Sequence, residues 1–265
     1  MTKHLAGRTA LLTGATGGIG HAIARALHRR GAQLILTGRR TDVLEPLAQE
    51  LGARSFPVDL ERPAEVDRLL GEVGHVDLLV ANAAVPGSGP LLEYTNAQID
   101  RALQVNLRAP MILARHLAET MVAQQWGHLV FISSLAGKAS SPGSSVYSAT
   151  KFGLRGFGQG LRGDLHGTGV GVSVVFPGFI RDAGMFADSG VKLPGFVGTS
   201  TPEQVADRVI VAIEHDRGEV DVAPLSMKLG SRFSTVAPSL SARLQRRLGG
   251  EKIAAELGAG QAAKR

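Results

Sequence analysis

Short, nearly continuous apolar segments alternate with stretches of helical length along most of this 265-residue chain. Strands buried on both faces of a parallel sheet have this character, and a strand followed repeatedly by a helix is typical of a doubly wound α/β sheet. The predicted strands are Thr9–Thr13, Gln33–Thr37, Arg54–Val58, Asp77–Ala81, His128–Ser133, Val170–Phe176 and Glu219–Val222. The predicted helices cover residues 19–30, 42–51, 63–73, 97–125, 146–166 and 202–216. We therefore expect one domain over residues 1–224, a doubly wound parallel sheet flanked by helices.

Positive charge gathers in the remaining residues, 225–265, which we call the C-terminal extension. The net charge of the chain is +6, and the extension holds eight basic and two acidic side chains, whereas residues 1–224 hold 21 of each. A body without excess positive charge lacks the attraction that nucleic acids require, so we expect no nucleic-acid partner.

Several kinds of site are excluded by composition. The chain has no cysteine, so it forms no disulfide, thiolate metal site or cysteine nucleophile. Its eight histidines show no metal-ligand spacing, so we expect no metal. The first residues are too polar for a signal peptide, and no apolar segment approaches membrane-spanning length. We expect a cytoplasmic protein.

A glycine-rich loop, Thr13-Gly14-Ala15-Thr16-Gly17-Gly18-Ile19-Gly20, joins the first predicted strand to the first helix. Glycines permit positive φ and close approach of the backbone to a ligand, and a helix N-terminus offers free N–H groups to phosphates. An ordinary glycine-rich turn is the alternative, but the position between strand and helix favours a dinucleotide site.

A second glycine pattern, residues 158–163, matches G-x-G-x-x-G but lies within a predicted helix, so we reject it as a dinucleotide site. A better explanation is a stripe along one helix face, formed by Gly153, Gly156, Gly160, Gly163 and Gly167. Such a stripe indicates close approach of another helix, as at the two-fold axis of a homodimer, although fraying would explain its last turn equally well.

The end of the second strand indicates which nicotinamide cofactor binds. NAD-binding folds usually place an acidic residue there to hold the ribose 2′-hydroxyl. This chain has Arg39 and Arg40 instead, and guanidinium groups suit a 2′-phosphate. We therefore predict NADP(H) bound by Arg39, with NAD(H) disfavoured, and leave Arg40 as a solvated side chain.

An acid–base site is predicted where Tyr147 and Lys151 share a helix face, four residues apart. An ammonium near a phenol lowers the pKa of the phenol from about 10 toward neutral pH. The hydroxyl of Ser134, after the fifth predicted strand, would bond a substrate carbonyl while Tyr147 delivers the proton.

Together these motifs resemble the short-chain dehydrogenase/reductase family, in its compact subgroup with T-G-x-x-x-G-x-G and Y-x-x-x-K, over about residues 7–222. The resemblance implies a single-domain Rossmann-type sheet. It implies that the cofactor is bound by Thr13, Gly14, Thr16, Gly18, Ile19, Gly20, Asp59, Leu60, Asn82, Ala83, Tyr147, Lys151, Pro177, Gly178 and Ile180. It also implies that Ser134, 13 residues before Tyr147, is the catalytic serine rather than Ser133, and that Asn106 holds a proton-relay water.

The implied reaction is hydride transfer between nicotinamide and a carbonyl or secondary alcohol. A non-catalytic NADP-binding sensor or scaffold on the same fold is the alternative.

Residues 179–200 should cover a small-molecule substrate. Their apolar side chains favour a lipophilic one, and those expected to contact it are Phe179, Met185, Phe186, Val191, Leu193, Phe196 and Val197. The family often has a threonine where this chain has Asp182, which puts the local nicotinamide contacts in doubt.

The C-terminal extension departs from the family's usual short close, which favours a homodimer over a tetramer. Val236, Leu240, Leu244 and Leu248 recur every four residues and predict an amphipathic basic helix. This helix would rest on an anionic membrane or cover a lipophilic pocket, or it would pack on its own domain or on a partner subunit. We favour packing, because one short apolar stripe binds membranes weakly.

Overall fold

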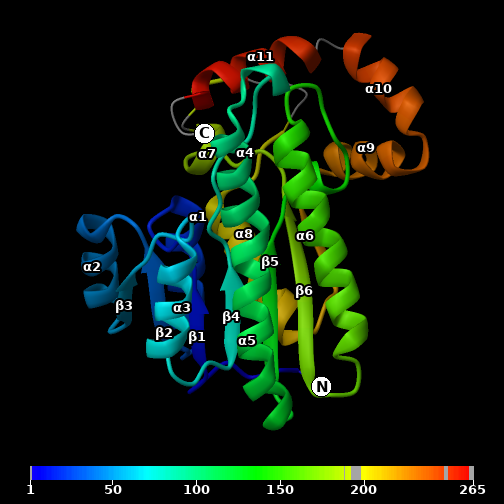
Figure 1. Ribbon diagram of the computed structural model, residues 1–265. Coiled ribbons are helices and arrows are strands. Elements are labelled where there is room, and N and C mark those ends of the chain that lie inside the picture. Colours follow the sequence, from blue (N-terminus) through cyan, green and yellow to red (C-terminus); the bar gives the residue numbers. More distant parts are fainter. Residues whose placement is uncertain (1, 188, 192–197, 248–249, 263–265) are drawn as a thin grey trace.

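Seven parallel strands form a single sheet in the order β3-β2-β1-β4-β5-β6-β7 (Figure 1). The computed structural model describes residues 2–187, 189–191, 198–247 and 250–262. The strands are β1 Thr9–Leu12, β2 Gln33–Gly38, β3 Arg54–Pro57, β4 Leu78–Ala81, β5 Gly127–Ile132, β6 Val170–Pro177 and β7 Glu219–Val222. Because β1 pairs with both β2 and β4, the chain winds outward in two directions from this pair, as the doubly wound prediction requires.

Helices cover both faces of the sheet and enclose two apolar cores. The helices are α1 Gly18–Arg29, α2 Thr41–Glu50, α3 Pro63–Glu72, α4 Asn96–Leu103, α5 Ala109–Ala123, α6 Ser145–Asp164, α7 Gly184–Ala187, α8 Pro202–Glu214, α9 Leu225–Val236, α10 Pro238–Arg247 and α11 Gly250–Gln261. One core packs α1, α2 and α8 against the sheet, with Leu27 and Val209 fully buried. The other packs α3, α5 and α6 against the opposite face, with Leu69 and Leu113 fully buried.

The predicted helix over residues 97–125 is interrupted. Between α4 and α5 lies a π-helical turn, Gln104–Arg108, after which the Ala109 N–H donates to the carbonyl of Gln104, five residues back. Pro110 explains the change, because proline has no N–H to donate to the carbonyl four residues before it, which is that of Asn106. The apolar periodicity alone could not reveal this turn.

The glycines of α6 have two different surroundings. The rejected motif at residues 158–163 does lie within this helix, and a Cβ at Gly158 would overlap the side chain of Val174 on β6. Among the described residues, none comes within 4 Å of a Cβ built at Gly156, Gly160 or Gly163. The stripe therefore faces outward over its middle part, while Gly153 packs against Leu107.

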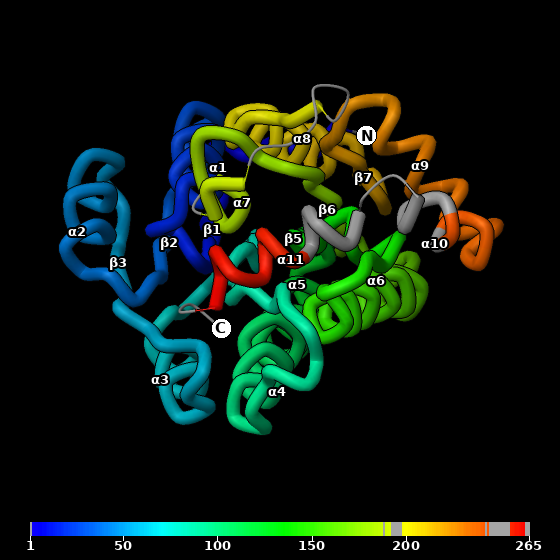
Figure 2. The backbone as a smooth tube through the Cα atoms, turned by 90° about the horizontal axis from the view of Figure 1, so that it is seen from above, coloured from blue at the N-terminus to red at the C-terminus, as the bar shows by residue number. Residues whose placement is uncertain are grey.

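The C-terminal extension contains three helices where the sequence predicted one continuous stripe. α9 ends at Val236 and α10 begins at Pro238, because a proline disfavours helical geometry in the residue before it, here Ala237. Val236 and Leu240 therefore belong to different helices, and Leu248 lies outside the described residues. Seen from above, α11 crosses the carboxyl edge of the sheet near α7, and α9 and α10 lie at the rim (Figure 2). None of the helices in the described ranges combines the length and apolar character needed to cross a bilayer.

A histidine is buried at the opposite, amino-terminal edge of the sheet. His128 on β5 has no exposed surface, and its Nε2 lies 2.7 Å from the hydroxyl of Ser173 on β6. Burial, and to a smaller extent the positive charge of Lys3, lower the pKa of His128 to about 3. The folded protein therefore keeps this imidazole neutral.

We predict that the free energy of unfolding falls as the pH is lowered from 6.5 toward about 3. In that window the unfolded chain protonates His128 and the folded chain does not, which contributes up to about 1.4 kcal/mol per pH unit. Urea denaturation over this range should show a shallower pH dependence for His128→Gln than for the parent chain. The matched control is His166→Gln at an exposed histidine. Equal slopes for His128→Gln and the parent chain would contradict the prediction.

Candidate active site

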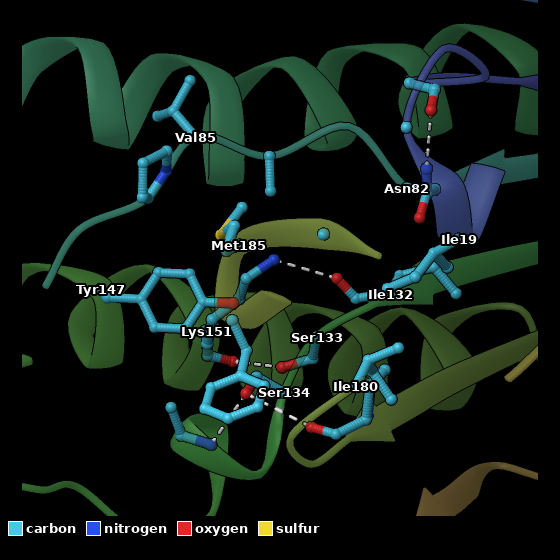
Figure 3. A pocket seen from close by; sticks show the side chains of 18 of the residues that line it. Ile19, Asn82, Val85, Ile132, Ser133, Ser134, Tyr147, Lys151, Ile180 and Met185 are labelled. Atoms are coloured by element: carbon cyan, nitrogen blue, oxygen red, sulfur yellow. Dashed lines mark hydrogen bonds between the residues drawn. The ribbon is translucent and has the colours of Figure 1, made fainter. Parts of the chain in front are cut away.

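A cavity of ≈ 1030 Å³ opens at the carboxyl ends of the strands, above the junction of β1 and β4. Open parallel sheets bind ligands at this switch point, because the loops after β1 and β4 diverge there. Its wall contains residues from the glycine-rich loop, from the ends of β4, β5 and β6, and from the C-terminal extension. Figure 3 shows the part around Tyr147 and Lys151.

The glycine-rich loop forms one end of the cavity and leaves no room for side chains at its tightest points. Gly14 has φ +67°, and a Cβ there would lie 2.7 Å from the Cα of Ala83. A Cβ at Gly20 would overlap the carbonyl of Gly14. α1 begins immediately at Gly18, and its N-cap, Gly17, has no side chain to bond the free N–H groups. This cradle fits the pyrophosphate of a dinucleotide.

Thr13, Asn82 and Ala83 hold this cradle together. The Thr13 hydroxyl accepts hydrogen bonds from the N–H groups of Asn82 and Ala83, both at 3.1 Å. The Asn82 side-chain amide donates to the carbonyls of Thr13 and Gly14, also at 3.1 Å. Asn82 and Ala83 line the cavity, whereas Thr13 is 1% exposed beneath it, so the structure gives Thr13 a positioning role.

The far end of the cavity contains Arg39, Asp59 and Leu60, the residues predicted for the adenosine half of the cofactor, and Arg40, which the sequence left as a solvated side chain. Thr16 and Ile19 line the cavity from the glycine-rich loop. The guanidinium of Arg40 donates to the carbonyl of Thr16 and so braces the loop. Arg39 is exposed beside it, where its charge is available to a phosphate.

Tyr147 and Lys151 extend from α6 into the cavity, and Ser134 meets them from the turn after β5 (Figure 3). The hydroxyl of Ser134 acts on that of Tyr147 and lowers its pKa, although a larger effect of burial opposes this. The Lys151 amine donates to the carbonyl of Ile132 at 3.0 Å and is buried, which lowers its pKa to about 8. Gly87 lets the loop after β4 pass close to the tyrosine, because a Cβ there would lie 2.9 Å from that of Tyr147.

The expectation that Lys151 lowers the pKa of Tyr147 is wrong for the protein by itself. Burial raises the pKa of Tyr147 to about 12, and the hydrogen bond with Ser134 only partly opposes this effect. The Lys151 amine lies 5.5 Å from the centre of the tyrosine ring and bonds Ile132 instead of the phenol. Desolvation therefore outweighs the attraction between these two side chains.

The two adjacent serines after β5 have different surroundings. Ser133 is 4% exposed, and its hydroxyl donates to the Lys151 carbonyl at 3.0 Å, which ties α6 to β5. Ser134 caps a short 3₁₀ turn, Leu135–Gly137, by accepting from the Ala136 N–H at 3.1 Å, and its hydroxyl lies 3.4 Å from the Pro177 carbonyl. Of the two, Ser134 is the one whose hydroxyl affects the pKa of Tyr147, and the choice of Ser134 over Ser133 as the catalytic serine stays a prediction.

Asn106 lies beneath the cavity wall, in the π-helical turn. Its side chain is 1% exposed and bonds the backbone of Val85 twice, accepting from the N–H at 2.8 Å and donating to the carbonyl at 3.0 Å. Val85 lines the cavity opposite Tyr147 (Figure 3). The side chain of Asn106 thus positions the loop after β4, and the proton-relay role stays a prediction.

Pro177, Gly178 and Ile180 line the wall after β6, where the sequence predicted contacts to nicotinamide. Ile180 is 4% exposed and forms an isolated bridge with Ser200. Asp182 has φ +68°, and its side chain is 70% exposed and pairs with Arg181 at 3.4 Å. Its carboxylate therefore points to solvent and takes no part in the wall.

The rest of the cavity wall comes from the segment 179–200, as predicted, and from the C-terminal extension. From the segment 179–200, Phe179, Met185 and Phe186 line it, and the rings of Phe179 and Phe186 pack at a tilt of 51° with their centres 4.9 Å apart. Leu193, Phe196 and Val197 lie outside the described residues. The extension also contributes to the cavity, as the alternative of a helix covering a lipophilic pocket allowed, but none of its residues was predicted individually; they include Met227, Ser231, Phe233, Leu257 and Gln261. Across the described part of the chain, no cluster of three or more His, Asp or Glu side chains is suited to a metal ion.

Comparison with known proteins decides the family. A family model described as short chain dehydrogenase matches residues 8–192. The chain belongs to this family. Ketoacyl reductase HetN from Nostoc sp. strain PCC 7120 is 37% identical over 227 residues, which cover 82% of this chain and 79% of that protein.

Solved structures of short-chain dehydrogenases share the fold. One from Sphingobium yanoikuyae, in complex with NADPH, has a TM-score of 0.76 and 28% identity and covers 90% of this chain and 95% of its own. A metagenomic short-chain oxidoreductase in complex with NADP has a TM-score of 0.69 and 33% identity. The match covers 83% of this chain and 98% of that one. The predicted family, fold class and enzyme class, a dehydrogenase/reductase, are therefore confirmed.

We predict that Asn106→Ala lowers the free energy of unfolding by about 1–3 kcal/mol, because the buried N–H and carbonyl of Val85 lose their partner. Urea denaturation measures this loss. The control Asn96→Ala, at an exposed asparagine of α4, should change stability by less than about 0.5 kcal/mol. A loss no greater at Asn106 than at Asn96 would show that the Val85 contacts contribute little.

Proposed function

We propose that this short-chain dehydrogenase is an NADP(H)-dependent oxidoreductase that interconverts a lipophilic carbonyl and its secondary alcohol. The observation that carries the proposal is the convergence of Ser134, Tyr147 and Lys151 on one wall of a cavity whose other end is a glycine-rich phosphate cradle. A proton donor and a dinucleotide site in one cavity are what carbonyl reduction requires.

NADP(H) is the cofactor that the cavity fits best. The cradle formed by Gly14, Gly18 and Gly20 suits the pyrophosphate, and Arg39 lies where a ribose 2′-phosphate would be bound. The similar structures from Sphingobium yanoikuyae and from a metagenome contain NADPH and NADP, which supports this choice.

NADPH, when bound, supplies a hydride to the carbonyl carbon of the substrate. Ser134 donates a hydrogen bond that orients and polarises the substrate oxygen, and Tyr147 donates the proton that this oxygen takes up. Lys151 is held by the Ile132 carbonyl at 3.0 Å, and its amine would bind the nicotinamide ribose. The Tyr147 hydroxyl and the Lys151 amine both point into the cavity (Figure 3).

The pKa of Tyr147 favours the direction of reduction. With this pKa raised to about 12, the phenol holds its proton throughout the neutral range and is ready to donate it. Oxidation of an alcohol would instead require Tyr147 as a base. We therefore propose a reductase.

The substrate is proposed to be lipophilic because aromatic and thioether side chains dominate the wall beside the catalytic residues. They come from two segments, residues 179–186 and the extension, and comprise Phe179, Met185, Phe186, Met227 and Phe233. The name of the relative HetN, a ketoacyl reductase, is consistent with an acyl-chain substrate, but bulky ketones fit the same wall. A homodimer through α6 is proposed on the outward-facing Gly156, Gly160 and Gly163.

We predict that Tyr147→Phe lowers kcat for ketone reduction by at least about 10²-fold while NADPH binding is retained, because only the proton donor is lost. The assay is NADPH oxidation with a panel of ketones and 3-oxoacyl thioesters, together with cofactor titration. The chain's other tyrosine provides the control, since Tyr94→Phe should retain activity. Undiminished turnover in Tyr147→Phe would refute the assignment.

We predict that Arg39→Ala weakens NADPH binding by about 10- to 100-fold and leaves NADH binding nearly unchanged, because a charged hydrogen bond to phosphate is worth about 1.5–3 kcal/mol. Arg40→Ala is the comparison: it removes the contact with Thr16 and should affect both cofactors alike. Equal losses for NADPH and NADH in Arg39→Ala would mean that Arg39 does not bind the 2′-phosphate.

A further inference from the structure

α9 turns an apolar stripe toward solvent. Leu225, Leu229 and Val236 are 71%, 55% and 86% exposed, and Phe233 is 41% exposed. At about 100° per residue, these four positions lie within one narrow arc of the helix. Leu240, at 56% exposure, continues the apolar surface onto α10. Single exposed apolar residues are ordinary, but a stripe along two helices indicates a binding surface.

The opposite face of α9 is turned inward and combines Met227 with the small polar side chains of Ser231 and Ser234. Ser231 is 5% exposed, and it lines the cavity together with Met227 and Ser234. The Thr235 hydroxyl lies 3.2 Å from the carbonyl of Lys138 on the domain and 3.0 Å from that of Ser231 in its own helix, so its one proton is shared between the two. An ordinary surface helix buries its apolar face and exposes its polar one, and α9 has the reverse orientation.

Charge distinguishes between the partners that could cover this surface. Residues 225–250 contain five basic side chains, Lys228, Arg232, Arg243, Arg246 and Arg247, and no acidic one. Arg232 belongs to the exposed stripe itself, and Arg243 is exposed on α10. A second copy of this surface would bring like charges together, whereas anionic lipid headgroups would neutralise them while the lipid chains accept the apolar side chains.

We propose that α9 and the start of α10 form a docking surface for an anionic membrane, with Leu225, Leu229, Val236 and Leu240 inserted at the headgroup boundary. α9 and α10 lie at the rim of the molecule (Figure 2). Because the inward face of α9 lines the cavity, docking places the cavity beside the lipid. This proposal departs from our preference from the sequence, which was a helix that packs on its own domain or on a partner subunit.

The test is cosedimentation of the full chain with vesicles of phosphatidylcholine, with and without phosphatidylserine, at low and high salt. We expect binding to phosphatidylserine vesicles that weakens at high salt, and little binding to phosphatidylcholine alone. Leu229→Asp/Val236→Asp should abolish binding. Arg232→Glu should weaken it about 25-fold, since each unit of charge near the surface contributes about a fivefold factor and the substitution changes the charge by two units.

Two matched variants distinguish a specific loss of vesicle binding from misfolding. Leu229→Phe/Val236→Phe keeps the apolar area and should retain binding. Arg29→Glu makes the same charge change at an exposed residue that ends α1, at the amino edge of the sheet, and should also retain it. Light scattering after gel filtration reports the oligomeric state of each variant without lipid.

Two outcomes would overturn the proposal. One is the absence of binding to phosphatidylserine vesicles, or equal binding by Leu229→Asp/Val236→Asp. The other is an oligomer of the parent chain that Leu229→Asp/Val236→Asp dissociates, which would assign the surface to a second copy. Vesicle binding requires no hydride transfer, and reduction of a water-soluble ketone requires no vesicle, so each proposal can fail alone.

Discussion

The hydrogen bonds between the ends of β1 and β4 hold the site together. Thr13 and Asn82 exchange bonds across the junction where the sheet changes direction, and the same bonds fix the carbonyl of Gly14. The loops after β1 and β4 run in opposite directions and leave a cavity, while the glycine-rich loop is held at its edge. A phosphate cradle binds well when its N–H donors are in position before the phosphate arrives. The bonds of Thr13 and Asn82 hold the backbone of the loop in that position.

Burial acts differently at the two edges of the sheet. At the carboxyl edge it raises the pKa of Tyr147 and lowers that of Lys151, and both groups face a cavity where a substrate can use them. At the amino edge it lowers the pKa of His128, beside Ser173 and with a carboxylate oxygen of Asp216 4.0 Å away. These are the residue types of a hydrolytic triad, but Ser173 and His128 have no exposed surface. A perturbed pKa therefore indicates a functional site here only when a cavity accompanies it.

The sequence predicted most of the fold because the buried strands are short and bounded by clear helical segments, and most boundaries agree within about two residues. It located the wall residues Ser134, Tyr147 and Lys151 but could not distinguish them from Thr13 and Asn106, whose side chains lie under the wall. For Asn106 this position depends on the π-helical turn before Pro110, which the apolar periodicity of the sequence does not reveal. The individual cavity residues of the extension were missed because polar side chains on a helix ordinarily face solvent, whereas the serines of α9 line the cavity.

Contacts with Gly178 and with Lys138 set the orientation of α9. Met227 packs on the backbone of Gly178, where a Cβ would lie 3.3 Å from the methionine methyl, and Thr235 bonds the Lys138 carbonyl. Lys138 is itself fixed by Asp221 at 2.6 Å and Glu219 at 2.9 Å, on the edge strand β7. Rotating α9 to bury Leu225, Leu229 and Val236 would break these contacts and would remove Ser231 from the cavity. The exposed stripe is therefore a consequence of how the cavity wall is built, and the free energy of covering it remains available to a partner.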